Sequence, residues 1–195
     1  MWLEYVAKVG NVLSQLEVTD GAGGAVAPDD GFARWTGMAA RLKPGGSLHL
    51  VGNGASASMA SHFSTDITKN CGIRAGVFTD SSLITALGND HGFEESYALA
   101  LSRYGRPGDL LVAISSSGNS PNILNACRRA PELEIGVVTV SAKSGDNALR
   151  SLGDLNFYVP GKNFSLAESC HAVVLHHWTD MLEALHRDGS PPYCR

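Results

Sequence analysis

The chain has 195 residues, of which 44% are hydrophobic and 17% charged, a composition typical of one ordinary globular domain. Fifteen Lys and Arg residues against nineteen Asp and Glu give a net charge of −4, so no basic field is present to hold a nucleic-acid backbone. No apolar run approaches the roughly 18 to 20 residues that cross a bilayer, and residues 1–8 do not have the pattern of a secretory leader. We therefore expect a cytoplasmic protein with neither nucleic-acid nor membrane partners, in which the cysteines at 71, 127, 170 and 194 stay reduced.

Two helices are predicted ahead of the first strand. Apolar residues from Leu3 to Leu16 recur at three- and four-residue steps, which predicts an amphipathic helix within the first twenty residues. The glycine-rich stretch 21–31 predicts a loop, and a second short helix is predicted at 32–42. The apolar faces of the first helix and of a long helix predicted at 165–186 either pack on their own domain or join copies of the chain, and we expect homo-oligomerisation.

From Ser47 onward the pattern alternates between strands and helices. Five apolar runs predict strands, at residues 48–51, 76–78, 110–114, 135–140 and 155–159. Helices are predicted at 55–69 and 122–129, the second with Pro121 in the first-turn position that proline favours. This alternation predicts an α/β fold, with a five-stranded parallel sheet flanked by helices in a three-layer α/β/α arrangement and an N-terminal helical extension.

Two polar turns follow predicted strands, at the carboxyl ends where open α/β sheets bind ligands. The first turn is residues 52–56, and the second, residues 115–120, has four serines and one glycine before a helix whose free N–H groups attract an anion. No lysine follows the glycine as in a nucleotide P-loop, and GxGxxG is absent from both turns, so a phosphate monoester fits better than ATP or NAD. The alternative is a serine-rich turn that only caps a helix.

Candidate metal ligands occur on two predicted helices. His62 and Asp66 are four residues apart and share one helix face, so one divalent ion can bridge them, although such spacing is more often a surface pair. Glu168 and His176 are eight residues apart, with about 12 Å of rise between them, so both reach one ion only by leaning together. His171 and His177 can be metal ligands or can be buried without a metal in the core or an interface. We favour burial for His177.

The dipeptide Asn89-Asp90 begins an acidic and aromatic stretch that extends to Tyr97. Asn and Asp are good helix caps, so by themselves these residues indicate only a turn.

Four segments together resemble the sugar isomerase (SIS) domain family and, within it, the bacterial phosphoheptose isomerases. They are VGNGASASMASHFSTD at 51–66, ALGNDHGFEESY at 86–97, ISSSGNSPNIL at 114–124 and ESCHAVVLHH at 168–177. The resemblance implies one SIS domain over 1–195, with residues 1–45 as N-terminal helices for oligomerisation and 46–195 as the sugar-phosphate-binding core. It also implies an isomerase that interconverts sedoheptulose 7-phosphate and an aldoheptose 7-phosphate through an enediol, with one zinc ion per subunit, in a homotetramer.

The resemblance also assigns residues to the site. The substrate-binding positions it implies are Asn53, Gly54, Ala55, Ser56, Asp66, Asn89, Asp90, Ser115, Ser116, Ser117, Ser120 and Glu168. The zinc ligands it implies are His62, Asp66, Glu168 and His176. Asp66 would act as the base that removes the sugar proton, and His176 as the acid and base on the sugar oxygens.

The chain departs from the family pattern around these ligands. Asp66 replaces a glutamate and is one methylene shorter, and Glu168 replaces a glutamine and adds a negative charge. Ala55 replaces a turn glycine, and Ser165 and Leu166 replace an Asp and an Arg. Two histidines and two carboxylates still form a ligand set that suits a divalent ion, so the changes indicate retuning rather than loss of the site.

Two alternative functions follow. One is the same chemistry on another higher sugar phosphate, such as an eight-carbon sugar, because the altered residues surround a retained serine turn. The other is a non-catalytic SIS protein that binds a sugar phosphate or a protein partner; family members of that kind tend to lose the metal-side residues that this chain keeps.

Overall fold

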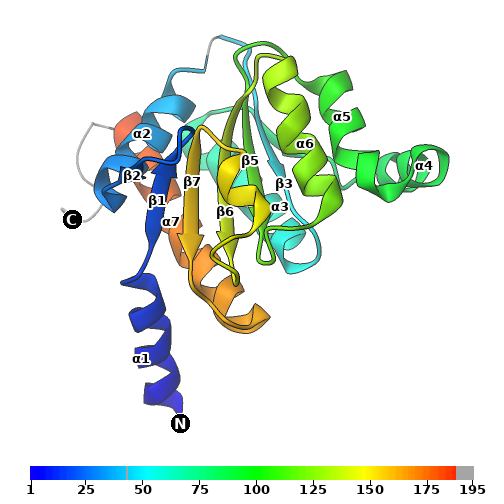
Figure 1. Ribbon diagram of the computed structural model, residues 1–195. Helices are drawn as coiled ribbons and strands as arrows, with labels where there is room; N and C mark the ends of the chain where they lie inside the picture. The colour runs from blue at the N-terminus through cyan, green and yellow to red at the C-terminus, as the bar shows by residue number, and fades with distance from the viewer. Residues whose placement is uncertain (43, 188–195) are drawn as a thin grey trace.

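The computed structural model describes residues 1–42 and 44–187. Its centre is one seven-stranded sheet in the order β2-β1-β7-β6-β5-β3-β4 (Figure 1). The five strands from β7 to β4 are mutually parallel and confirm the predicted parallel sheet. They are β3 Leu48–Val51, β4 Ala75–Val77, β5 Leu110–Ser115, β6 Gly136–Ala142 and β7 Leu155–Val159.

Helices cover both faces of the sheet, as the alternating pattern predicts. One face packs against α2 (Pro28–Ala40), α3 (Ala55–Cys71) and α7 (Phe164–Arg187), and the other against α5 (Ser96–Tyr104) and α6 (Pro121–Glu132). Strand side chains alternate between the two cores: Leu48 and Leu50 point to the first, and Val51 to the second. This period of two explains why both faces of the central strands are apolar.

The N-terminal region differs from the sequence prediction. Helix α1 (Trp2–Leu13) is shorter than predicted, and the residues after it form an antiparallel ribbon of β1 (Glu17–Asp20) and β2 (Ala25–Val26) along the edge of β7. The sheet therefore has seven strands instead of five, and the extension is not purely helical. Local periodicity missed β1 because its pairing partner, β7, lies far along the chain and Val18 packs against Gly31 of α2.

Between β4 and β5 the chain forms α4 (Ser81–His91), the 3-10 turn η1 (Phe93–Glu95) and α5, and a second 3-10 turn, η2 (Ala148–Ser151), follows β6. Figure 1 shows α4 at the side of the molecule and α1 extending away from the sheet. Among the described residues, no helix is long and apolar enough to span a membrane.

Candidate active site

The two predicted ligand turns lie side by side, because β3 and β5 are neighbours in the parallel sheet. Together with the start of α7 they enclose a cavity of about 270 Å³ at the carboxyl ends of these strands. Its lining includes nine of the predicted substrate-binding residues: Asn53, Gly54, Ala55, Ser56, Ser115, Ser116, Ser117, Ser120 and Glu168. Phe164 completes the lining; sequence analysis missed it, since an exposed aromatic residue at a helix start carries no motif.

The serine turn 115–120 is held in shape by backbone contacts. Gly118 has a φ of +63°, and its N–H donates to the hydroxyl of Ser115 at 3.1 Å. Its carbonyl accepts from the N–H of Leu149 at 3.0 Å, and the Asn119 side chain accepts from the N–H of Ala148 at 3.0 Å. The first N–H groups of η2 thus anchor the turn from outside the cavity.

Helix α6 begins directly at this turn, with Pro121 in its first position as predicted. Ser120 is the N-cap residue, and its side chain makes no capping hydrogen bond. The hydroxyl of Ser120 and the positive end of the helix are therefore both available to an anion in the cavity.

The first turn depends on two glycines. A Cβ at Gly52 would lie 2.5 Å from the Ser56 backbone, and Gly54 has a φ of +56°. The carbonyl of Gly52 also accepts a 2.6 Å hydrogen bond from Tyr97. Ala55 is the first residue of α3 and is exposed, so a methyl group is accommodated where the resembling family has glycine.

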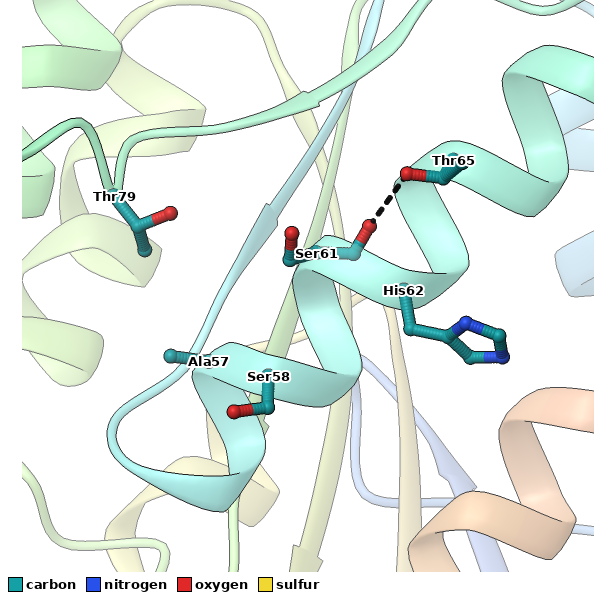
Figure 2. Close-up of a pocket in the computed structure, with 6 residues that line it drawn as sticks. All are labelled: Ala57, Ser58, Ser61, His62, Thr65 and Thr79. Carbon is teal, nitrogen blue, oxygen red and sulfur yellow. Dashed lines mark hydrogen bonds between the residues drawn. The ribbon is translucent and has the colours of Figure 1, made fainter.

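Three of the four predicted metal ligands lie together where α3 packs against α7. The Nε2 atom of His62 is 3.2 Å from a carboxylate oxygen of Asp66, and the rings of His62 and His176 are 5.7 Å apart. Figure 2 shows the His62 imidazole directed away from Thr79. Glu168 lies instead in the serine cavity, and no group of three or more His, Cys, Asp or Glu side chains within residues 1–42 and 44–187 is arranged to hold one metal ion.

A second, larger hollow of about 570 Å³ follows the outer face of α3 (Figure 2). Its lining is rich in hydroxyl groups, which are suited to hydrogen-bonding a sugar, and consists of Ala57, Ser58, Ser61, His62, Thr65 and Thr79. Sequence analysis singled out only His62 among these residues. Ser58, Ser61 and Thr65 follow one face of the same helix at three- and four-residue steps, a signal that was present in the sequence, whereas Thr79 comes from the segment after β4.

Asn89 and Asp90 are placed elsewhere. Both lie exposed near the end of α4, where the Asn89 amide donates to Asp90 at 2.9 Å. Neither lines the serine cavity in the single chain.

Two histidines and two cysteines of α6 and α7, at 127, 170, 171 and 177, lie in or against the core. His171 is fully buried, and its ring nitrogens have no hydrogen-bond partner among the described residues. Burial lowers the pKa of His171 to about 4, and the nearby backbone of Ser141 only partly opposes this shift. His177 packs edge-on against Phe32, in agreement with the prediction that its ring is buried rather than bound to a metal. Burial raises the pKa of Cys170 and raises that of Cys127 to about 12, so both stay protonated; Cys194 lies outside the described residues.

Comparison with known proteins agrees with this architecture. The model of the SIS domain family matches residues 4–142. The chain is 36% identical over 156 residues to the phosphoheptose isomerase of Bordetella avium, covering 75% of this chain and 78% of that protein.

Solved structures extend the likeness to three dimensions. A phosphoheptose isomerase from Francisella tularensis superposes with a TM-score of 0.79 at 27% identity, over 93% of this chain and 94% of that one. The phosphoheptose isomerase of Neisseria gonorrhoeae gives a TM-score of 0.72 at 29% identity, over 78% of this chain and 86% of that one. The chain belongs to the SIS domain family.

Proposed function

We propose that the chain is a phosphosugar isomerase that interconverts sedoheptulose 7-phosphate and an aldoheptose 7-phosphate through an enediol. The observation that carries the proposal is the serine-lined cavity at the start of α6, which is suited to a phosphate monoester. The names of the similar proteins support the choice of sugar. The two substituted carboxylates, Asp66 and Glu168, make a longer sugar phosphate the alternative substrate.

The phosphate occupies the serine turn and anchors one end of the sugar. Ser115, Ser117 and Ser120 donate to its oxygens, and the positive end of α6 stabilises its charge. Binding energy at this unreactive end is used to position C1 and C2 at the other end.

The reacting carbons lie further along α3 and α7. Asp66 is two to three turns beyond the cavity on α3, and His176 lies on the neighbouring stretch of α7. From the ketose, the Asp66 carboxylate removes a proton from C1 and returns it to C2. His176 gives a proton to the carbonyl oxygen on C2 and takes the proton of the hydroxyl on C1, so no net proton is gained or lost.

Asn89 and Asp90 complete the proposed substrate contacts. They are exposed and do not line the cavity in one chain, so they would reach the sugar by movement of α4 or from a second copy.

We assign the metal site, with zinc as the preferred ion, to His62, Asp66 and His176 at the α3–α7 contact. As they stand, the described side chains are not grouped to hold one ion, so these residues would have to close around it. Nδ1 of His176 donates to the carbonyl of Ala172 at 2.8 Å, so Nε2 is the ring nitrogen that remains available. Nε2 can hold the ion or exchange protons with the sugar oxygens but not both at once, so the proton-transfer role of His176 requires that its Nε2 is not bound to the ion. His62 is about half exposed, and its carboxylate partner supplies an oxygen ligand. Glu168 would be the fourth ligand, from the same chain or from another. When bound, the ion polarises the sugar carbonyl as a Lewis acid.

We also propose that the active form is a homotetramer. Trp2 and Leu3 of α1 are 73% and 78% exposed, although they lie on an apolar helix face. Tyr5 of the same helix reaches Ser169, next to Glu168, so a second copy packed on α1 would lie beside the cavity. Light scattering of a Leu3→Glu, Val6→Glu variant tests this: a tetramer is expected to dissociate, and an unchanged mass contradicts the assignment.

The decisive experiment follows turnover of sedoheptulose 7-phosphate by chelator-treated and zinc-reconstituted protein, with the metal content measured. Zinc-dependent turnover supports the whole proposal, and Ser120→Ala should then raise KM about tenfold through the loss of one hydrogen bond to a charged group. Bound zinc without turnover indicates another sugar phosphate. If the protein has no bound zinc and no turnover, the result indicates a binding protein.

A further inference from the structure

The cavity proposed to bind phosphate has an unusual charge balance. Its lining residues are serines, Asn53, Gly54, Ala55, Phe164 and Glu168, so within this lining the one formal charge is negative. A phosphate monoester carries up to two negative charges at neutral pH, and the carboxylate of Glu168 disfavours its binding. A nearby cation would restore the balance.

Lys143 is placed to supply that cation. In the parallel pairing of β5 and β6, Ser115 lies opposite Ser141, so Lys143 follows Ser141 by the same two residues by which Ser117 follows Ser115. The side chain of Lys143 then extends over Phe164, with its ammonium nitrogen 3.9 Å from the centroid of the ring. Because Phe164 is part of the cavity lining, the ammonium group is one aromatic ring from the cavity.

The backbone of Lys143 is also unusual. It has a φ of +61°, and among the described residues only Glu134 shares this left-handed conformation without being a glycine. The conformation is held by the hydroxyl of Tyr158, which donates to the carbonyl of Lys143 at 3.0 Å. Such strain is retained mainly at functional sites, and here it occurs at the residue whose side chain contacts Phe164.

The other cations near this edge are less suited to the role. Arg150 donates to Glu17 and to the carbonyl of Gly145, both at 2.6 Å, and lies over the Tyr158 ring. Lys162 is exposed on the segment before α7.

We infer that Lys143 is the cation of the phosphate subsite. This inference rests on the proposed phosphate site. The ammonium group of Lys143 rests on Phe164 in the free protein and turns onto the phosphate oxygens when the ligand binds. The four-carbon side chain provides this reach. The exchange is favourable because a charge-assisted hydrogen bond to phosphate is stronger than a solvent-exposed cation–π contact.

The test uses inorganic phosphate as the ligand, measured by isothermal titration calorimetry on the full chain. Lys143→Gly is the main variant, since glycine adopts a positive φ without strain and should keep or raise the melting temperature of the free protein. We expect it to bind phosphate about tenfold more weakly. Lys162→Gln, a matched loss of charge two residues before Phe164, should bind within twofold of the unchanged chain.

Equal phosphate affinity in Lys143→Gly and the unchanged chain would overturn the inference, as would an equal loss in Lys162→Gln. Because this measurement needs no turnover, it separates the two proposals. If phosphate binding depends on Lys143 but the protein does not isomerise the sugar, the subsite is supported and the proposed reaction is contradicted. If the unchanged chain does not bind phosphate, the subsite and the proposed reaction are both contradicted.

Discussion

Asn53 and Asn122 form a reciprocal amide pair. The Nδ2 atom of each donates to the Oδ1 atom of the other at 2.9 Å, although 69 residues separate them in the chain. Asn53 belongs to the turn after β3, and Asn122 is a buried residue in the first turn of α6. The pair therefore joins the two turns that line the serine cavity.

Asn122→Ala should weaken both the fold and the site. It leaves the Asn53 amide without its partner, which costs about 1–3 kcal/mol of unfolding free energy, and it loosens the first turn so that KM for the sugar phosphate rises. Urea unfolding and steady-state kinetics measure the two effects. A double-mutant cycle with Asn53→Ala should give a clear coupling energy. Arg129→Ala, on the exposed face of the same helix, is the control, and independent effects at the two asparagines would contradict the link.

Asp66 is the residue on which the proposed proton transfer depends. Asp66→Asn keeps the size of the side chain but removes the base, so kcat should fall by about 100-fold or more. Asp66→Glu restores the length found in the resembling family and should retain turnover. Lys69→Ala, an exposed change three residues away on the same helix, controls for local disturbance, and zinc content is measured in each variant. Full activity of Asp66→Asn would reject the base assignment.

His171 should make stability depend on pH. Its folded-state pKa of about 4 lies below the usual 6.5, so the unfolded chain binds the additional proton between these values. The free energy of unfolding is therefore unaffected by this group above pH 6.5 and falls as the pH drops toward 4, by about 3 kcal/mol in total. Chemical unfolding at several pH values should show a shallower acid loss for His171→Leu. Parallel curves for the two proteins would contradict the prediction.

His49 and Asp109 form a buried side-chain hydrogen bond at the amino ends of β3 and β5, with 3.0 Å between Nε2 and Oδ2. The Asp109 carboxylate also accepts the N–H groups of Ser47 at 2.8 Å and Arg106 at 2.9 Å. Asp109→Ala removes all three contacts and should lower the free energy of unfolding by about 3 kcal/mol or more. Because the pair lies at the end of the strands away from the serine cavity, KM should stay unchanged. An unaltered urea midpoint would show that the pair does not stabilise the fold.

Local sequence patterns determined the parallel core and one half of the site. Residues 48–51 and 110–114 show the short apolar runs of buried strands, and Pro121 marks the start of a helix, because each signal depends only on neighbouring residues. Each turn could be placed at the carboxyl edge of the sheet before the structure was known, since each follows a predicted parallel strand. That the two turns share one cavity follows from the pairing of β3 with β5, which only the structure shows.

Tertiary structure decided what depends on partners distant in sequence. The β1–β2 ribbon forms because β1 pairs with the edge of β7. The spacing of apolar residues in the local sequence does not predict it. The Asn53–Asn122 and His49–Asp109 pairs join residues 69 and 60 positions apart. The packing of α7 against α3 places His176 beside His62 and leaves Glu168 in the serine cavity. A sequence pattern records which side chains share an element face, whereas packing determines which faces meet, and the chemistry of this site depends on both.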